Sequence, residues 1–229
     1  MRKTFDMEMQ SLHELMIKMG ALCEAAIDYA MKALFSGEKE DAIHAAELEV
    51  EINQMERDIE QLCYKLLLRQ QPVARDLRQI SATLKMITDM ERIGDQAADI
   101  AELSVLGNVV EFEKNTAIKE MSCCAKNMVV ESIDAYVNHD LSLAFSIMEE
   151  DDKVDAYFDQ IKHELVSLLL TNPASAEGVV DLLMVAKYLE RIGDHAVNIS
   201  EWVVFIVTGE YHKENEQGAL YHDYLSGRR

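Results

Sequence analysis

The sequence contains few of the residues that interrupt helices. Only Pro72 and Pro173 are proline, and nine of the 229 residues are glycine. Proline removes a backbone donor and ends helices, so a chain with two prolines can form long ones. This composition is typical of a globular helical protein. The length fits one large domain or two small ones and is enough to bury about 70% of the unfolded surface.

Basic residues are also scarce. The chain has 22 Lys and Arg against 42 Asp and Glu, a formal charge of −20, which argues against binding to nucleic acid or to an anionic membrane as the main activity. The start, Met1-Arg2-Lys3, leads into polar residues with no apolar signal-peptide core. The apolar run from Trp202 to Val207 is too short for a bilayer core of about 30 Å. We therefore expect a cytoplasmic protein without membrane insertion.

Motifs for nucleophilic catalysis are missing. The sequence has no Gly-rich phosphate loop, no Gly-x-Ser-x-Gly and no Cys/His pairing. Its four cysteines (Cys23, Cys63, Cys123 and Cys124) have no Cys-x-x-Cys spacing and lie inside helical patterns. We expect four free, mostly buried thiols in a reducing compartment.

Apolar residues at helical spacing predict six long helices. The expected ranges are the first 35 residues, 38–69, 73–105, 112–137, 140–170 and 176–208. The breaks fall at Ser36-Gly37, Pro72, Gly107-Asn108, the turn before Asp140, and Thr171-Asn172-Pro173, with Asp140 a plausible N-cap. Helices of this length, about 45 Å, need partners along their whole extent, which predicts a bundle.

The two halves of the chain repeat each other. Met19 corresponds to Met121 and Ala42 to Ala144 at an offset of 102 residues, and Glu91 corresponds to Glu190 at an offset of 99. The sequence therefore predicts an all-α fold of two tandem three-helix-bundle repeats, over 1–108 and 109–209. The remaining tail, 210–229, loses its periodicity and is either a short docked helix or a frayed terminus.

The third helix of each repeat carries the same acidic stripe. Glu-Arg-Ile-Gly-Asp occurs at 91–95 and at 190–194. The stripes consist of Glu91, Asp95, Asp99 and Glu102 in the first repeat, and of Glu190, Asp194, Asn198 and Glu201 in the second. On a helix each set lies within an arc of roughly 80°. Like charges at i,i+4 cost roughly 0.2–0.5 kcal/mol per pair, so we expect a cation, either a Lys or Arg or a metal ion, to face each stripe.

The middle helices supply further acids in matching register. Asp151 and Asp155 in the second repeat correspond to Glu49 and Asn53 in the first. If the middle and third helices pack side by side, these residues oppose the stripes, and carboxylates on facing helices can bind hard metal ions. A mid-helix glycine costs about 1 kcal/mol, so Gly94 and Gly193 predict a close neighbour there.

Two interpretations of the stripes stay open at this point. In one, Lys and Arg side chains fill them; candidates are Arg75, Lys85, Arg92, Lys187 and Arg191. In the other, they hold metal. A redox di-iron site is disfavoured because neither stripe has the Glu-x-x-His spacing of such bundles. His195 corresponds to Gln96 in the other repeat, so we expect it to be a polar surface or bundle-edge residue and not a ligand.

The doubled motif resembles the PhoU family of phosphate-signalling regulators. The resemblance covers about residues 5–208 and includes Arg69-Gln70-Gln71-Pro72, Asp76-Leu77-Arg78 and Asp151 to Asp155. It implies two three-helix repeats, usually a homodimer, with iron, zinc or another divalent metal cluster on the acidic motifs. The metal-site candidates carried over are Glu91, Asp95, Asp99, Glu190, Asp194, Asp151 and Asp155, with Glu49 weaker. The chain departs from the pattern at Asn53 and Asn198.

The resemblance also implies a function. Such proteins have no known catalytic activity, link the ATPase subunit of a phosphate ABC transporter to a sensor histidine kinase, and repress the phosphate-starvation response and phosphate uptake. Two rivals remain: a carboxylate-bridged metalloenzyme, and a purely structural helical scaffold.

Overall fold

Six α-helices make up most of the part of the chain that the structure describes. The computed structural model describes residues 2–70, 72–105 and 116–210. The helices are α1 (Arg2–Ser36), α2 (Lys39–Gln70), α3 (Ala74–Val105), α4 (Thr116–Asn138), α5 (Leu141–Thr171) and α6 (Ala176–Thr208), with a 3-10 turn η1 (Pro173–Ser175) before α6. Within these ranges there is no strand, which confirms the predicted fold class.

The helix ends follow the predicted signals. Gly37 adopts a φ of 70° and donates its backbone N–H to the Ala33 carbonyl at 2.9 Å, ending α1. Asp140 caps α5 by accepting from the Leu143 N–H at 3.1 Å, as predicted. The expected start of helix four at 112, the Gly107-Asn108 break and the tail after 210 lie outside the described residues.

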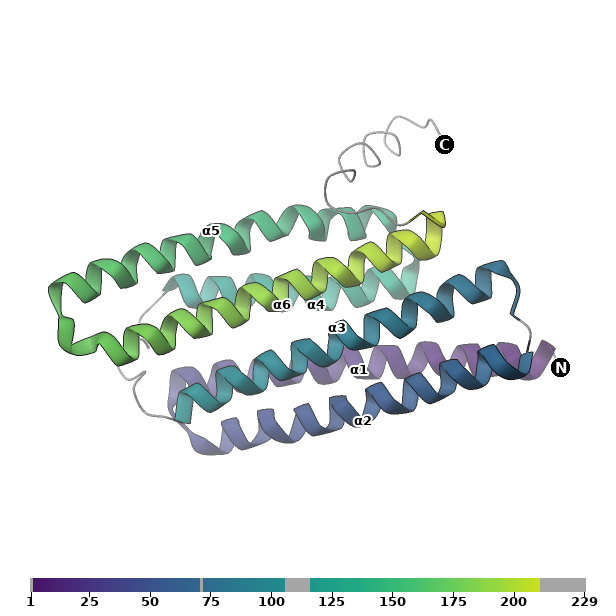
Figure 1. The fold of residues 1–229 in the computed structure, drawn as a ribbon, viewed down its shortest axis with the longest axis horizontal. Helices are drawn as coiled ribbons and strands as arrows, with labels where there is room; N and C mark the ends of the chain where they lie inside the picture. Colours follow the sequence, from purple (N-terminus) through teal and green to yellow (C-terminus); the bar gives the residue numbers. More distant parts are fainter. Residues whose placement is uncertain (1, 71, 106–115, 211–229) are drawn as a thin grey trace, which may run out of the picture.

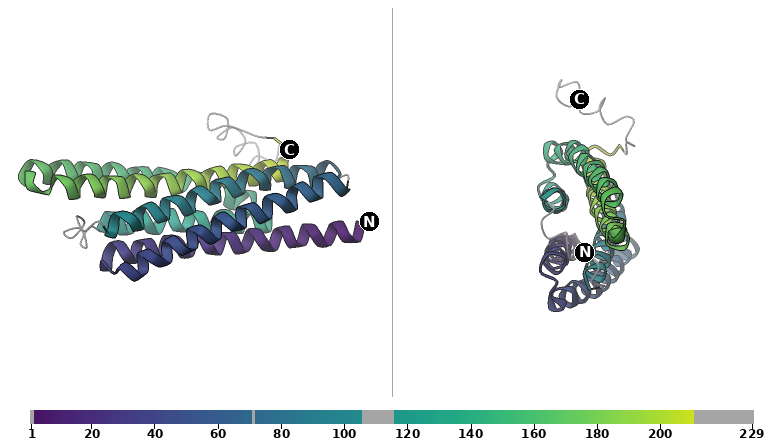
Figure 2. Two further views of the ribbon diagram at one scale, coloured as in Figure 1. Left: turned by 60° about the horizontal axis from the view of Figure 1, so that its bottom comes forward. Right: turned by 90° about the vertical axis from the view of Figure 1, so that its left-hand side faces the viewer.

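The two three-helix bundles lie side by side. Within each bundle all three helices touch, and the bundles meet through α3 with α6 and α1 with α4 (Figure 1). In the described part of the chain, the middle helices α2 and α5 pack mainly within their own repeats, on the outer sides (Figure 2). The α2–α3 turn and the α5–α6 turn lie at opposite ends of the elongated molecule. This arrangement places each acidic motif next to a middle helix.

One continuous apolar core fills both bundles. It includes buried methionines on the facing sides of α1, α3 and α4, among them Met16, Met90 and Met128. The cysteines differ from expectation: all four are free, but only Cys23 and Cys63 are buried, whereas Cys124 is half-buried and Cys123 is exposed. The pair stands at the edge of the apolar face of α4, where consecutive residues turn away from the core. No described helix has the length and apolarity needed to cross a membrane.

Candidate functional site

The motif glycines admit the neighbouring helix at close range. A Cβ on Gly94 would lie 2.9 Å from the Cδ1 atom of Ile52 on α2. A Cβ on Gly193 would lie 3.3 Å from Oδ1 of Asp151 and 3.5 Å from Val154, both on α5. Ile52 and Val154 occupy equivalent positions in the two repeats. The expectation that each glycine permits a close contact is therefore confirmed.

In the second repeat this contact brings acids from two helices together. Asp151 and Asp155 come from α5, and Glu190 and Asp194 from α6; we call these four residues the acidic quartet. The Asp151 pKa rises to about 7, first because the group is buried, and then because of Asp194, Asp155, Asp152 and Glu190. Burial and neighbouring carboxylates also raise the pKa of Asp155 and of Asp194. The electrostatic repulsion in the quartet is thus only partly relieved.

Few cations offset this repulsion. Lys187 forms an ion pair with Glu190, and its positive charge opposes the rise in the pKa of Asp155 and of Asp194 without cancelling it. The Oδ1 atom of Asp151 is buried and has no hydrogen-bond partner. An unpartnered buried carboxylate oxygen is unfavourable and is the kind of atom that a proton or a cation would satisfy.

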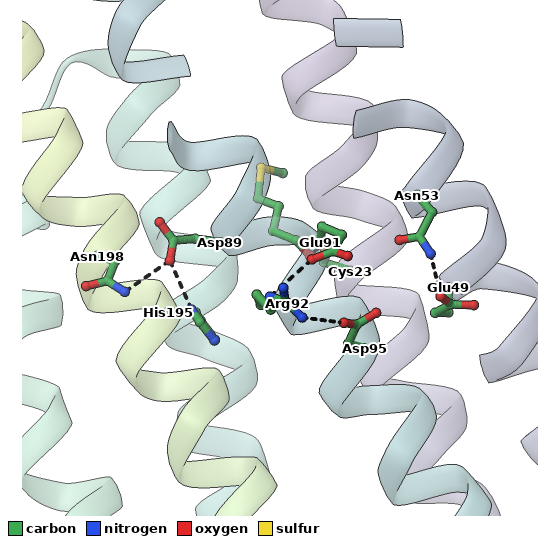
Figure 3. A network of polar contacts seen from close by, with 10 residues as sticks. Cys23, Glu49, Asn53, Asp89, Glu91, Arg92, Asp95, His195 and Asn198 are labelled. Carbon is green, nitrogen blue, oxygen red and sulfur yellow. Dashed lines mark hydrogen bonds and ion pairs between the residues drawn. The ribbon is translucent and has the colours of Figure 1, made fainter. Parts of the chain in front are cut away.

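In the first repeat, an arginine offsets the repulsion between the motif carboxylates. Arg92 donates from Nη1 to Asp95 at 3.1 Å and lies with its Nε 3.4 Å from Glu91 (Figure 3). On α2, the Asn53 amide donates to Glu49 at 2.5 Å, where the second repeat has two aspartates. The Glu91 pKa is still raised, by burial first and then by Asp95, with Arg92 acting in the opposite direction. The interpretation in which Lys and Arg side chains face the stripes is thus confirmed for Arg92 and Lys187, and the metal interpretation stays a prediction.

One acid near the first motif was missed by the sequence interpretation. Glu56 on α2 raises the pKa of Glu91. Its own pKa is raised by burial and by Glu60, against a hydrogen bond with Thr88 of α3. The repeat gave no signal for it, because the equivalent of Glu56 is Phe158.

The third stripe position faces the other repeat. Asp89 of α3 accepts from Asn198 of α6 at 3.0 Å, and Tyr188 of α6 interacts with Asp99 of α3, which opposes the burial-induced rise of the Asp99 pKa. At an offset of 99 residues, Asp89 corresponds to Tyr188 and Asp99 to Asn198. The two contacts are therefore equivalent, and they place Asp99 at the joint between the repeats.

His195 lies at the same joint and differs from expectation in its burial. Its Nδ1 is 2.9 Å from Asp89 Oδ1 (Figure 3), and both side chains are largely buried, at 16% and 17% exposure. It is an interface residue between α3 and α6, because the positions following the motif turn toward the facing bundle. The sequence repeat could not point to Asp89, because its equivalent in the second repeat is Tyr188.

The donor chemistry of the acidic quartet suits a hard cation, since it offers carboxylate oxygens and one of them is orphaned. The side-chain arrangement is less complete. Among the described residues, no group of three or more His, Cys, Asp or Glu side chains converges as a set of metal ligands. A bound metal would require side chains of the quartet to turn toward one another.

The fold and the motifs define a class: a duplicated three-helix bundle in which each repeat carries an acidic Glu-x-x-Gly-Asp motif against its middle helix. The PhoU domain family matches residues 16–104 and 118–203, and the chain belongs to this family. It is 35% identical over 215 residues to the phosphate-specific transport system accessory protein PhoU homolog of Clostridium acetobutylicum, covering 91% of this chain and 96% of that protein.

Solved structures agree with this assignment. The crystal structure of PhoU from Pseudomonas aeruginosa superposes with a TM-score of 0.84 at 33% identity, covering 90% of this chain and 100% of that one. The phosphate transport system regulatory protein PhoU from Streptococcus pneumoniae has a TM-score of 0.81 at 28% identity, covering 91% and 99%. Both repeats are included in the similarity.

Proposed function

We propose that this protein is a regulatory accessory protein of phosphate transport. The observation that supports this role most directly is the full-length similarity to proteins named as phosphate-specific transport system accessory proteins. The second repeat adds a site suited to regulation, because Asp151 of the acidic quartet has a pKa of about 7 and lies where α5 packs against Gly193 of α6.

The finer proposal concerns partners. The chain, as a homodimer on the cytoplasmic side, links the ATPase subunit of a phosphate ABC transporter to a sensor histidine kinase, and it represses the phosphate-starvation response when phosphate is plentiful. This proposal follows the resemblance of the doubled motif. The net charge of −20 and the exposed surfaces of α2 and α5 are compatible with contacts to other proteins.

Deletion of the gene in its host tests the regulatory proposal. A phosphate-starvation reporter should rise in phosphate-rich medium and return to its low level when the intact gene is restored. An unchanged reporter would contradict the regulatory role. Because the assay measures output and not stability, it also separates a regulator from a purely structural scaffold.

We further propose that divalent or ferric cations bind the acidic quartet more strongly than the first-repeat candidates Glu49, Glu91 and Asp95, where Arg92 already supplies a cation. Asp99 takes part less, since it interacts with Tyr188. Elemental mass spectrometry of protein purified without a metal-affinity tag tests this. Asp151→Asn with Asp194→Asn should lose metal, and Glu91→Gln with Asp95→Asn should retain most of it. Equal loss in both, or no metal in the parent protein after reconstitution, would contradict the proposal.

A further inference from the structure

A second cluster of titratable groups lies at the end of the bundle where α3 begins and α4 ends. It combines side chains from three helices: His13 of α1, Arg75, Gln79 and Thr83 of α3, and Tyr136 and His139 of α4 and the turn after it. We call these six residues the end cluster. The rings of His13 and Tyr136 have centroids 5.5 Å apart, and the His139 N–H donates to the Tyr136 carbonyl at 3.4 Å. On α3, the three residues follow i,i+4 spacing and share one face.

Polar atoms of the end cluster are buried without partners. Tyr136 and Thr83 are completely buried, and neither the Tyr136 hydroxyl nor the Thr83 hydroxyl has a hydrogen-bond partner. Tyr136 is close enough to Thr83 and Gln79 for them to oppose the burial-induced rise of its pKa, without forming a well-aligned bond. The Nδ1 atom of His139 is also buried and unpartnered. Because buried polar atoms in native proteins are nearly always satisfied, the His139 nitrogen points to an absent partner, and the Tyr136 and Thr83 hydroxyls, which are neighbours, retain hydrogen-bonding capacity.

The end cluster is cationic within a strongly acidic protein. The His139 pKa is lowered by burial and then by the charges of Arg75 and His13; no carboxylate among the described residues raises it. The carboxylates nearest in the chain are Asp76 and Asp140, and the Asp140 side chain caps α5 through the Leu143 N–H. Arg75 is exposed and forms no ion pair with a described residue. The six residues thus include hydrogen-bond donors and one permanently charged side chain, Arg75, and no carboxylate; Asp76, which follows Arg75 in the sequence, has a buried carboxylate oxygen.

Helix packing does not require these polar residues. The second repeat has Gly178 and Leu182 in place of Gln79 and Thr83, and the first repeat has Leu34 in place of Tyr136. Leu34 and Leu182 are buried, so apolar side chains fill the equivalent positions. The polar set was therefore not imposed by the duplicated architecture, and a ligand accounts for it better than folding does.

We propose that the end cluster binds a small tetrahedral oxyanion, such as inorganic phosphate or sulfate. Arg75 would supply the permanent charge, and the His13 and His139 rings would donate to the anion and become protonated at low pH. The hydroxyls of Tyr136 and Thr83 would be the neutral donors beneath them. Phosphate and sulfate oxygens accept from such donors through charge-assisted hydrogen bonds. The proposal uses none of the residues of the acidic motifs and stands apart from the regulatory function.

Isothermal titration calorimetry with inorganic phosphate, and separately with sulfate, tests the proposal on the full chain. Sulfate should bind more tightly at about pH 6 than at about pH 8, because its charge is constant over that range and histidine protonation is not. Arg75→Ala and His139→Asn should each weaken binding roughly tenfold. Asparagine tolerates the left-handed backbone of His139, which has a φ of 52°.

Arg57→Ala is the matched control, since Arg57 is also an exposed helix arginine but lies on α2. It should leave binding unchanged. Tyr136→Phe should weaken binding while keeping the buried ring, and if that variant unfolds, Arg75→Ala decides alone. No binding at about 10 mM anion, a range too weak for a built site, or an equal loss in Arg57→Ala would show adventitious ion association only and overturn the proposal.

Discussion

Asp151 couples the acidic quartet to pH. Its pKa in the folded protein is about 7, against an ordinary value of 3.8. A carboxyl group with a raised folded-state pKa favours the folded state when protonated, so it contributes stability at low pH and loses it as the pH rises from about 4 to about 7. The group destabilises the metal-free protein most above that range.

We therefore expect Asp151→Asn to stabilise the metal-free protein at about pH 8, by about 1–2 kcal/mol after allowance for solvent screening. The difference from the parent protein should vanish near pH 4. Urea unfolding in the presence of a chelator, at several pH values, measures it. Glu149→Gln is the control, because Glu149 is an exposed acid of the same helix. A variant that is less stable than the parent at pH 8 would contradict the repulsion.

Arg92 is the residue that distinguishes the first motif from the second. The equivalent Arg191 acts instead on Asp99 across the repeat joint. Arg92→Ala should raise the Glu91 pKa further, since it removes the main opposing charge. Its effect on the free energy of unfolding should stay within about 1 kcal/mol, because the Arg92 side chain is half exposed and such ion pairs are weak. Carboxyl NMR titration of Glu91 measures the first effect; an unchanged pKa would be evidence against the ion pair.

At the scale of the helices, the two motif glycines differ in how tightly they are packed. Gly94→Ala would force a Cβ to within 2.9 Å of buried Ile52, whereas the Cβ of Gly193→Ala would lie 3.3 Å from Asp151, a tight contact that a small shift of the Asp151 side chain relieves. Overpacking costs about 1–3 kcal/mol and the gain in helix propensity is about 1 kcal/mol. We expect Gly94→Ala to destabilise by about 1 kcal/mol or more and Gly193→Ala to be close to neutral.

The control for this prediction is a second change on α2. Ile52→Val removes the Cδ1 atom that the new Cβ would meet. The substitution should therefore lower the free energy of unfolding less in the Gly94→Ala background than in the parent protein. Thermal unfolding of the four proteins gives the coupling energy. Additive effects would show that the two residues do not meet.

The helices and their ends could be predicted from the sequence, but most contacts between helices could not. Local signals located the Gly37 and Asp140 helix ends, and the repeat located Gly94 against α2, because both depend on spacing along the chain. Glu56 and Asp89 were not found, since neither has an acidic equivalent in the other repeat. Their roles depend on which faces of two helices meet. The same limit applied to Arg92 and Arg191, which are identical in sequence context but have different partners.

For the whole molecule, the joint between the repeats determines whether they respond as one unit. Asp89 accepts from both His195 and Asn198 across that joint and is largely buried. Asp89→Ala leaves two side chains of α6 without their acceptor, and unsatisfied partly buried donors cost about 1–3 kcal/mol. We expect a loss of this size in urea unfolding, with a smaller loss for Asn198→Ala, which removes one of the two bonds.

The same joint predicts how the protein unfolds. Because α3 packs against α6 and α1 against α4 in one continuous core, unfolding one repeat would expose the apolar joint face of the other. We therefore expect calorimetry of the parent protein to show one cooperative transition, with the calorimetric enthalpy equal to the van't Hoff enthalpy. Asp89→Ala should weaken that coupling, so that the van't Hoff enthalpy falls below the calorimetric enthalpy while the protein still folds. Two separate transitions in the parent protein would mean that each bundle is stable by itself, and a signal at the acidic quartet would then have no route to the first repeat through the joint.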